Sequence, residues 1–269
     1  MTETFRPVRL RGLELGSGRP KIIVPLTSES LTRLGVEAAE LDFTVADLVE
    51  LRIDHFDEVD DDDTVLRALE TTREALPDST PLLFTFRSKS EGGMREIDAD
   101  GYEALLLLAA SSGTVDAIDV EMFTELGSLE RIVNGCHARG ATVIMSSHDF
   151  ERTPSREQIV ARLTLQQDLG ADVVKIAVMP QSPRDVLTLL HATDEFVRTK
   201  ATRPAITMAM GPLGVVSRLA GETFGSVATF GSLGRASAPG QVDAHALRQV
   251  LDLVHGVGRT IPVPRGTEV

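Results

Sequence analysis

The chain has 269 residues, a length typical of one (β/α)8 barrel and also sufficient for two small domains. Hydrophobic residues make up 42% and charged residues 25%, as in proteins with a sizeable core, and the absence of Trp makes that core largely aliphatic. The net charge of −13 disfavours nucleic acids and anionic membranes as partners, although a local arginine cluster would still allow an anionic small molecule to bind.

The single cysteine and the absence of long apolar stretches narrow the class of protein further. Cys136 excludes a disulfide framework and a cysteine-based zinc site, and its helical neighbours predict a small packed side chain. No signal-peptide pattern opens the chain, and no apolar stretch approaches the ~18 residues of a membrane span. We therefore expect a cytoplasmic protein.

The chain begins with a predicted hairpin and continues with strands and helices in alternation. Residues 8–15 alternate apolar and charged side chains about Gly12, as a short hairpin does. Runs rich in β-branched and aliphatic residues are typical of buried strands. Such runs lie at Lys21–Leu26, Leu48–Ile53, Pro81–Phe86, Ala117–Val120, Thr142–Ser146, Val173–Val178, Ala205–Met210 and Ser226–Phe230.

Amphipathic stretches at helical spacing separate these strands and follow the last of them. Ser128 and Ser155 are candidate N-caps. The acidic run Asp60–Asp63 is most simply a solvated helix start, with a metal site as the alternative. The predicted helices lie at 29–41, 63–75, 99–110, 128–139, 155–169, 183–199, 214–221 and 243–255.

Eight alternating strand–helix units predict a parallel sheet, and eight of them in about 250 residues predict that it closes into a barrel. No linker is long enough to separate domains, so we expect residues 1–269 to form a single (β/α)8 barrel domain with an N-terminal hairpin. In such barrels the active site lies at the C-terminal ends of the strands.

One lysine stands out among the strand residues. Lys175 lies inside the run Ala171–Met179, which is closed by Pro180 and is typical of a buried strand. A buried ammonium must find partners or lose its proton, and an amine that loses its proton is a nucleophile towards carbonyl groups. The alternative is a lysine whose head group reaches solvent at the strand end.

Charged side chains also mark two other strands. In Glu50-Leu-Arg52-Ile-Asp54 the strand period of two places the three charges on one face, which we expect to point into the barrel mouth. A structural layer of ion pairs is the alternative. His148 follows the fifth strand and is a candidate general acid or base because histidine titrates near neutral pH.

Polar residues follow three further strands. Arg87 ends the third strand, and Glu91 lies just before Gly92-Gly93, a pair that favours a mobile loop able to bring Glu91 over the site. Arg218 follows the seventh strand. The segment 230–241 after the eighth strand lies where barrels often bind phosphate, but it has no clear glycine-rich helix start.

These residues together predict lysine-imine chemistry. An iminium acidifies the protons on the adjacent carbon, His148 is placed to remove one, and arginines hold carboxylates by bidentate contacts. The sequence has no zinc-ligand spacing and no glycine-rich nucleotide loop, so we expect no metal and no cofactor.

The motifs that surround these residues resemble one family, type I 3-dehydroquinate dehydratase. They occur in family order and span nearly the whole chain. The matching strings are Glu50-Leu-Arg-Ile-Asp54, Phe84-Thr-Phe-Arg87, Glu91-Gly-Gly93, Ser147-His-Asp-Phe150, Val174-Lys-Ile-Ala177, Thr207-Met-Ala-Met-Gly211, Ser217-Arg218 and Ser237-Ala-Pro-Gly-Gln241.

The resemblance implies a homodimeric barrel that converts 3-dehydroquinate to 3-dehydroshikimate and water, the third step of the shikimate pathway of aromatic amino acid biosynthesis. It implies that Lys175 forms the imine, that His148 moves the proton with Glu91 paired to it, and that Arg218 and Gln241 hold the substrate carboxylate. The residues that it implies for contacts with the ring hydroxyls or for the shape of the pocket are Glu50, Arg52, Arg87 and Ser237.

Two residues depart from the family pattern, and two other functions stay open. Ser147 stands where an aromatic residue is expected, and Pro25 where a serine is frequent, so either could alter pocket shape or affinity. A lysine-dependent (class I) aldolase would use the same fold but commonly needs a phosphate-binding site. A non-catalytic barrel that binds a carboxylate ligand or a protein partner would have no use for Lys175, His148 and Glu91 together.

Overall fold

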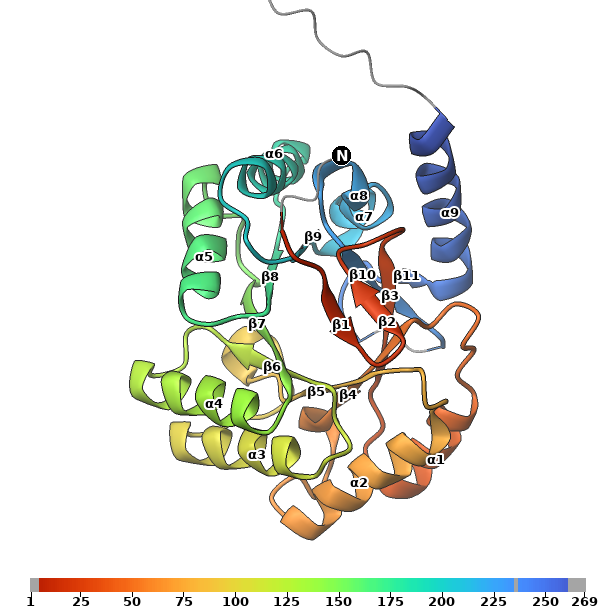
Figure 1. The fold of residues 1–269 in the computed structure, drawn as a ribbon, viewed down its shortest axis with the longest axis vertical. Helices are drawn as coiled ribbons and strands as arrows, with labels where there is room; N and C mark the ends of the chain where they lie inside the picture. Colours follow the sequence, from red (N-terminus) through yellow and green to blue (C-terminus); the bar gives the residue numbers. More distant parts are fainter. Residues whose placement is uncertain (1–4, 235–236, 261–269) are drawn as a thin grey trace, which may run out of the picture.

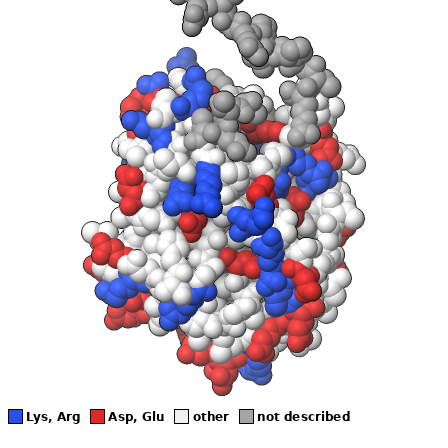
Figure 2. Space-filling view, viewed as in Figure 1, with Lys and Arg blue, Asp and Glu red and all other residues white. Residues whose placement is uncertain are grey.

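The computed structural model describes residues 5–234 and 237–260. Its first element is the predicted hairpin, formed by antiparallel strands β1 (Val8–Leu10) and β2 (Leu13–Leu15). Leu10 and Leu15 pack against residues at the starts of the barrel strands, such as Leu48 and Val173, so the hairpin covers the N-terminal end of the barrel. Figure 1 shows it lying across the barrel, and Figure 2 shows acidic and basic side chains interspersed on the face seen from that side.

Eight parallel strands form the barrel, as the sequence predicted. Each pairs with the next in chain order, β10 pairs with β3, and a backbone hydrogen bond of 2.9 Å from Val227 to Ala205 joins β10 to β9 and closes the ring. Two-residue strand β11 (Val242–Asp243) adds to β10 outside the ring. The barrel strands are β3 (Lys21–Leu26), β4 (Leu48–Arg52), β5 (Leu82–Thr85), β6 (Ala117–Glu121), β7 (Thr142–Asp149), β8 (Val173–Val178), β9 (Ala205–Ala209) and β10 (Ala228–Ser232).

Helices surround the strands (Figure 1). No helix in the described part of the chain is both long and apolar enough to cross a membrane. The α-helices are α1 (Leu31–Ala39), α2 (Asp62–Ala75), α3 (Ala99–Ser111), α4 (Leu126–Ala138), α5 (Arg156–Asp168), α6 (Pro183–Thr199), α7 (Gly211–Leu219), α8 (Gly221–Phe224) and α9 (Ala244–Thr260), and single 3-10 turns lie at η1 (Ile53–His55) and η2 (Lys89–Glu91).

The structure confirms one of the two predicted N-cap residues and contradicts the other. Ser155 caps α5 in a complete capping box, and Asp61 caps α2 by accepting from the backbone of Thr64, which confirms the acidic run as a helix start. The prediction for Ser128 was wrong. Helix α4 begins at Leu126 because the Glu125 carboxylate, three residues earlier, already accepts the backbone N–H of Ser128.

Two apolar layers hold the barrel together. One lies between the strands and the helices and includes Cys136, which is fully buried as predicted. The other fills the barrel interior at its N-terminal end with aliphatic side chains, among them Ile144 and Val173. Charged side chains replace aliphatic ones towards the C-terminal ends of the strands, and the candidate site lies there.

Candidate active site

A pocket opens at the C-terminal ends of the barrel strands. All nine residues predicted from the sequence for catalysis or substrate binding line it, although they come from six separate segments of the chain. Apolar side chains, including Phe150, Met208 and Phe230, complete the wall. The predicted site residues in this lining are Glu50, Arg52, Arg87, Glu91, His148, Lys175, Arg218, Ser237 and Gln241.

Lys175 reaches the pocket from the middle of β8 and is only 3% exposed. Its Nζ lies 2.8 Å from Asp119 Oδ2 and 4.7 Å from the centre of the Phe230 ring. The side-chain amide of Gln166 on α5 bonds both the N–H and the carbonyl of Lys175 at 2.9 Å. The buried amine has therefore found a partner, and the alternative of a head group in solvent was wrong.

Asp119 on β6 is fully buried and links the lysine to an arginine. Its Oδ1 accepts hydrogen bonds from Arg87 Nη2 at 2.7 Å and from Ser146 Oγ at 2.6 Å. Burial alone would raise the pKa of Asp119, but Arg87 and Lys175 outweigh burial and hold that pKa below its usual range. Asp119 is thus an ionised carboxylate with a cation on each oxygen.

Asp119, Glu121 and Ser146 were not predicted as site residues from the sequence. A signal was present, because Asp119 and Glu121 alternate with apolar residues along one strand, as Glu50 and Arg52 do. In the sheet, Glu121 pairs with Ser146 and Ser146 pairs with Lys175. The three side chains therefore lie in a row across β6, β7 and β8.

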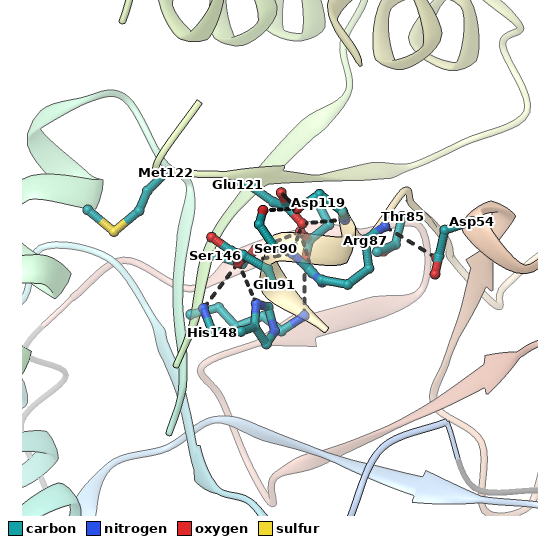
Figure 3. Close-up of polar contacts among 12 residues, drawn as sticks. Asp54, Thr85, Arg87, Ser90, Glu91, Asp119, Glu121, Met122, Ser146 and His148 are labelled. Atoms are coloured by element: carbon teal, nitrogen blue, oxygen red, sulfur yellow. Dashed lines mark hydrogen bonds and ion pairs between the residues drawn. The ribbon is translucent and has the colours of Figure 1, made fainter. Parts of the chain in front are cut away.

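Arg87 occupies the centre of this network (Figure 3). Besides Asp119, its guanidinium contacts Glu121 Oε1 at 2.8 Å, Ser146 Oγ at 3.0 Å and Glu91 Oε2 at 3.5 Å. Burial would lower its pKa, but the surrounding carboxylates raise it. Because protein groups occupy these donors, Arg87 supports the charged side chains beneath the pocket.

His148 and Glu91 form a hydrogen-bonded pair (Figure 3). His148 Nδ1 lies 2.8 Å from Glu91 Oε2, which also accepts the backbone N–H of His148 at 3.1 Å. Burial raises the pKa of Glu91 to about 8 and keeps the pKa of His148 well below its ordinary value. The two groups share a hydrogen bond and titrate as a coupled pair, and Nε2 can accept a proton in the tautomer whose ring proton lies on Nδ1, towards Glu91 Oε2.

The double glycine after Glu91 has a steric role. A Cβ at Gly92, whose φ is +86°, would lie 2.2 Å from the Phe150 ring, and one at Gly93 would lie 1.7 Å from the carbonyl oxygen of Arg87. Glu91 is already turned into the site and is only 5% exposed. The glycines therefore allow the loop to pack tightly beneath Phe150, which is a reason for them other than the expected mobility.

The charged face of β4 is only partly as predicted. Glu50 and Arg52 line the pocket, and Glu50 accepts from Thr85 Oγ1 at 2.9 Å. Asp54 does not line the pocket, because the strand ends at Arg52 and Asp54 lies in the 3-10 turn η1. There it binds the Arg52 guanidinium at 2.7 and 2.8 Å and accepts the backbone N–H of Arg87, so it fixes the arginine and the next strand end.

Arg218 differs from the other buried cations of the site. It lies in the last turn of α7 and is 2% exposed, yet no ion pair to it is found among the described residues. Among the described residues its guanidinium contacts Met208 Sδ at 3.5 Å and the carbonyl of Pro239 at 3.4 Å, and burial lowers its pKa to about 10. Arg218 thus presents to the pocket a positive charge that has no anionic partner among the described residues.

Ser237 and Gln241 close this side of the pocket and bond each other. Ser237 N–H donates to Gln241 Oε1, and Gln241 Nε2 donates to Ser237 Oγ, both at 2.8 Å. The helix that follows, α9, has the Asp243 carboxylate at its start, accepting the N–H of Ala246. A carboxylate in that position disfavours a bound phosphate.

The two departures from the family pattern lie outside the pocket lining. Ser147 is buried, and its hydroxyl has no hydrogen-bond partner within the described ranges. Pro25 on β3 pairs in register with Glu50 and is also buried. Neither substitution removes a polar group from the site. Within residues 5–234 and 237–260, no group of three or more His, Cys, Asp and Glu side chains is placed to hold a metal ion.

Comparison with known proteins adds a family to this geometry. Residues 22–257 match the family model of type I 3-dehydroquinase. The chain is 48% identical to a 3-dehydroquinate dehydratase of Bacillus licheniformis, over 92% of this chain and 97% of that protein, and 49% identical to one of Klebsiella pneumoniae, over 92% and 98%. The structure is similar to that of type I 3-dehydroquinate dehydratase from Clostridium difficile with covalently modified comenic acid, with a TM-score of 0.91, 45% identity and coverage of 94% and 99%.

Proposed function

The chain belongs to the type I 3-dehydroquinase family, and we propose that its pocket dehydrates 3-dehydroquinate to 3-dehydroshikimate through an imine on Lys175. The product lies on the shikimate pathway to chorismate and the aromatic amino acids. One observation supports the proposal above all. A buried lysine amine shares a pocket with a His–Glu pair and with an arginine that has no anionic partner among the described residues.

The first step joins Lys175 to the ketone carbon of the substrate. The amine, once it has lost a proton, adds through Nζ to the carbonyl carbon, and the carbonyl oxygen leaves as water with one further proton from Nζ and the proton that the ammonium first gave up. The product is an iminium that carries a positive charge on the lysine nitrogen. Phe230 and Asp119, the neighbours of Nζ in the structure, then surround this charge.

The second step is a proton transfer that His148 is placed to perform. Nε2 takes a proton from the carbon next to the iminium, and the electron pair of that C–H bond moves towards nitrogen to form an enamine. The pair then returns and expels the tertiary hydroxyl, which leaves as water with the proton from His148. Hydrolysis of the new iminium releases 3-dehydroshikimate and restores Lys175, so one water is lost overall.

The opposite wall binds the substrate. Arg218 offers a planar guanidinium to the substrate carboxylate, and Gln241 lies beside it on the same wall. Glu50, Arg52 and Ser237 face the remaining space, where the ring hydroxyls fit. Arg87 acts from beneath, because its donors already contact protein carboxylates.

We propose that residues 1–269 act as a single barrel domain, and that the protein works as a cytoplasmic homodimer without metal or coenzyme. These statements rest on the family resemblance and on the alternation of strands and helices in the sequence. The aldolase and binding-protein alternatives gain no support from the site, because α9 begins with a carboxylate and the imine machinery is complete.

Borohydride trapping tests the proposed function. The protein is incubated with 3-dehydroquinate, reduced, digested and mapped by mass spectrometry, and we expect the added mass on the peptide that contains Lys175. Samples without substrate and the Lys175→Ala variant are the controls. Modification confined to Lys21, Lys89 or Lys200 would refute the assignment.

A further inference from the structure

The reacting amine has a buried anionic neighbour to which the family resemblance assigned no role. Asp119 Oδ2 lies 2.8 Å from Lys175 Nζ, and both side chains are almost completely inaccessible, at 0% and 3% exposure. Glu91 and Glu121, the other carboxylates of this network, pair with Arg87, and neither forms an ion pair with Lys175. Within the described chain, Lys175 therefore pairs with one carboxylate.

Asp119 is poorly suited to act as a base. Both of its oxygens already accept hydrogen bonds, Oδ1 from Arg87 and Ser146 and Oδ2 from Lys175. Its pKa is held below the usual range of a carboxyl, so it has little tendency to take up a proton. At neutral pH its charge therefore remains beside the lysine nitrogen.

We propose that Asp119 is the counter-ion of the reacting nitrogen, and that it stabilises the positive charge on Nζ both in the resting ammonium and in the iminium. The inference rests on the proposed imine at Lys175. It assigns Asp119 an electrostatic role. The carboxylate makes the loss of the resting proton from Nζ less favourable, but it also keeps the imine protonated. Only a protonated imine accepts the electron pair from the neighbouring C–H bond.

The packing around Asp119 supports a fixed charge. Arg87 and Ser146 hold Oδ1 from one side, so the carboxylate cannot turn away when Nζ becomes bonded to substrate. The Gln166 amide holds the lysine backbone on the other side. A carboxylate fixed before the reaction stabilises the iminium without reorganisation.

The chain offers a matched control for this inference. Glu121 is also buried and also contacts Arg87, at 2.8 Å, but it lacks the contact with Lys175. Asp119→Asn and Glu121→Gln each remove one negative charge from the same network at nearly constant shape. Only the first removes the charge that touches the reacting nitrogen.

The first measurement is independent of the dehydratase reaction. The rate at which Lys175 is methylated by formaldehyde and cyanoborohydride is followed by peptide mass mapping between pH 6 and pH 11, because only the free amine reacts. In Asp119→Asn we expect the pH at which the methylation rate reaches half its maximum to fall by about one to three units, since the ammonium has lost its counter-ion. In Glu121→Gln we expect a shift of less than about one unit.

The second measurement is turnover. Although Asp119→Asn makes the amine more available, we expect kcat for 3-dehydroquinate to fall on the order of 10²–10³-fold, because the iminium has lost its stabilising charge. Borohydride should still trap substrate on Lys175 in this variant. If Asp119→Asn does not fold, Asp119→Ala avoids an amide donor opposite the ammonium and should give the same shift.

The outcomes separate this inference from the proposed function. If wild-type protein forms no adduct on Lys175, the proposed function fails. The other case is that the wild type is trapped at Lys175, but Asp119→Asn keeps the wild-type kcat and the wild-type pH dependence of methylation and only melts at a lower temperature. Asp119 is then a structural residue, and the inference is wrong.

Discussion

The two walls of the pocket treat charge in opposite ways. On the wall formed by β5 to β8, Lys175 and Arg87 contact Asp119, and His148 contacts Glu91. On the wall formed by β9, α7 and the segment before β11, Arg218 has only a sulfur atom and a carbonyl oxygen as neighbours among the described residues. The charges on the first wall are thus paired before substrate binds, whereas Arg218 on the second wall has no anionic partner among the described residues.

The difference follows from what each wall does in the proposed reaction. Groups that form bonds or move protons must be held in place beforehand, and mutual pairing holds them. A group that recognises an anion gains most from the ligand when protein carboxylates do not already compensate it. Arg218 is buried without an anionic partner among the described residues, which is unfavourable in the free protein, and a bound carboxylate removes that penalty.

The largest expected effect follows from removing the amine on the paired wall. Lys175→Ala should abolish dehydration almost entirely, because no other group in the pocket can form the imine. It should also destabilise the protein by about 1–3 kcal/mol, since Asp119 Oδ2 loses its cation while Arg87 still holds Oδ1. Steady-state assays and urea unfolding measure the two effects. Lys200→Ala, at an exposed lysine, is the control, and turnover in a folded Lys175→Ala variant would contradict the account.

The next effect separates proton transfer from imine formation. His148→Ala should lower kcat by about 10²–10⁴-fold, or more if the histidine also serves the imine steps, because the base is lost. The imine should still form, so borohydride should still modify Lys175. An unchanged kcat would remove His148 from the mechanism.

The unpaired wall should respond in binding. Arg218→Ala should raise KM strongly, because the substrate carboxylate loses its charged partner. The loss of binding free energy should be on the order of 2–5 kcal/mol. Arg218→Lys should recover part of the loss, since an ammonium lacks the planar pair of donors. If KM is unchanged in a variant that melts like wild type, the carboxylate is held elsewhere.

Glu91→Gln should have a smaller effect on kcat than His148→Ala, because Glu91 orients the base. It should also change the pH dependence of stability. Burial raises the pKa of Glu91 to about 8, so the wild type loses stability as pH rises from the unfolded pKa of about 4.5 through 8. Glutamine does not ionise, so the variant should gain on the order of 1–3 kcal/mol relative to wild type between pH 5 and pH 9. Urea unfolding at pH 5 and pH 9 tests this. A difference in unfolding free energy between variant and wild type that is the same at both pH values would contradict it.

The smallest expected effect is that of metal removal. Extensive dialysis against EDTA should leave kcat and KM unchanged, because the proposed steps use only side chains. Loss of activity that a divalent ion restores would contradict the account.

The sequence was sufficient for the barrel and for the residues that face the pocket. The strand pattern located Lys175 inside a buried strand and His148 at the C-terminal end of another, and the family motifs supplied their roles. The partners of these residues were not predictable in the same way. Asp119 lies 56 residues before Lys175, and the two meet only because parallel pairing brings β6, β7 and β8 into register.

The sequence-based predictions were wrong at element ends, where neighbouring residues compete to end a strand or to cap a helix. The position of Asp54 depends on where β4 gives way to a 3-10 turn, and the start of α4 depends on Glu125 capping before Ser128. The role of Gly92 depends on Phe150, which comes from another strand end. Spacing alone carries none of this information.

A crystal structure of the borohydride-reduced complex with substrate tests the contrast between the walls most directly. We predict a covalent bond from Lys175 Nζ to the former ketone carbon, with Asp119 still beside that nitrogen and the ligand carboxylate on the Arg218 guanidinium. A ligand bonded to another residue, or a carboxylate bound to Arg52 or Arg87 while Arg218 stays without an anion, would contradict the account.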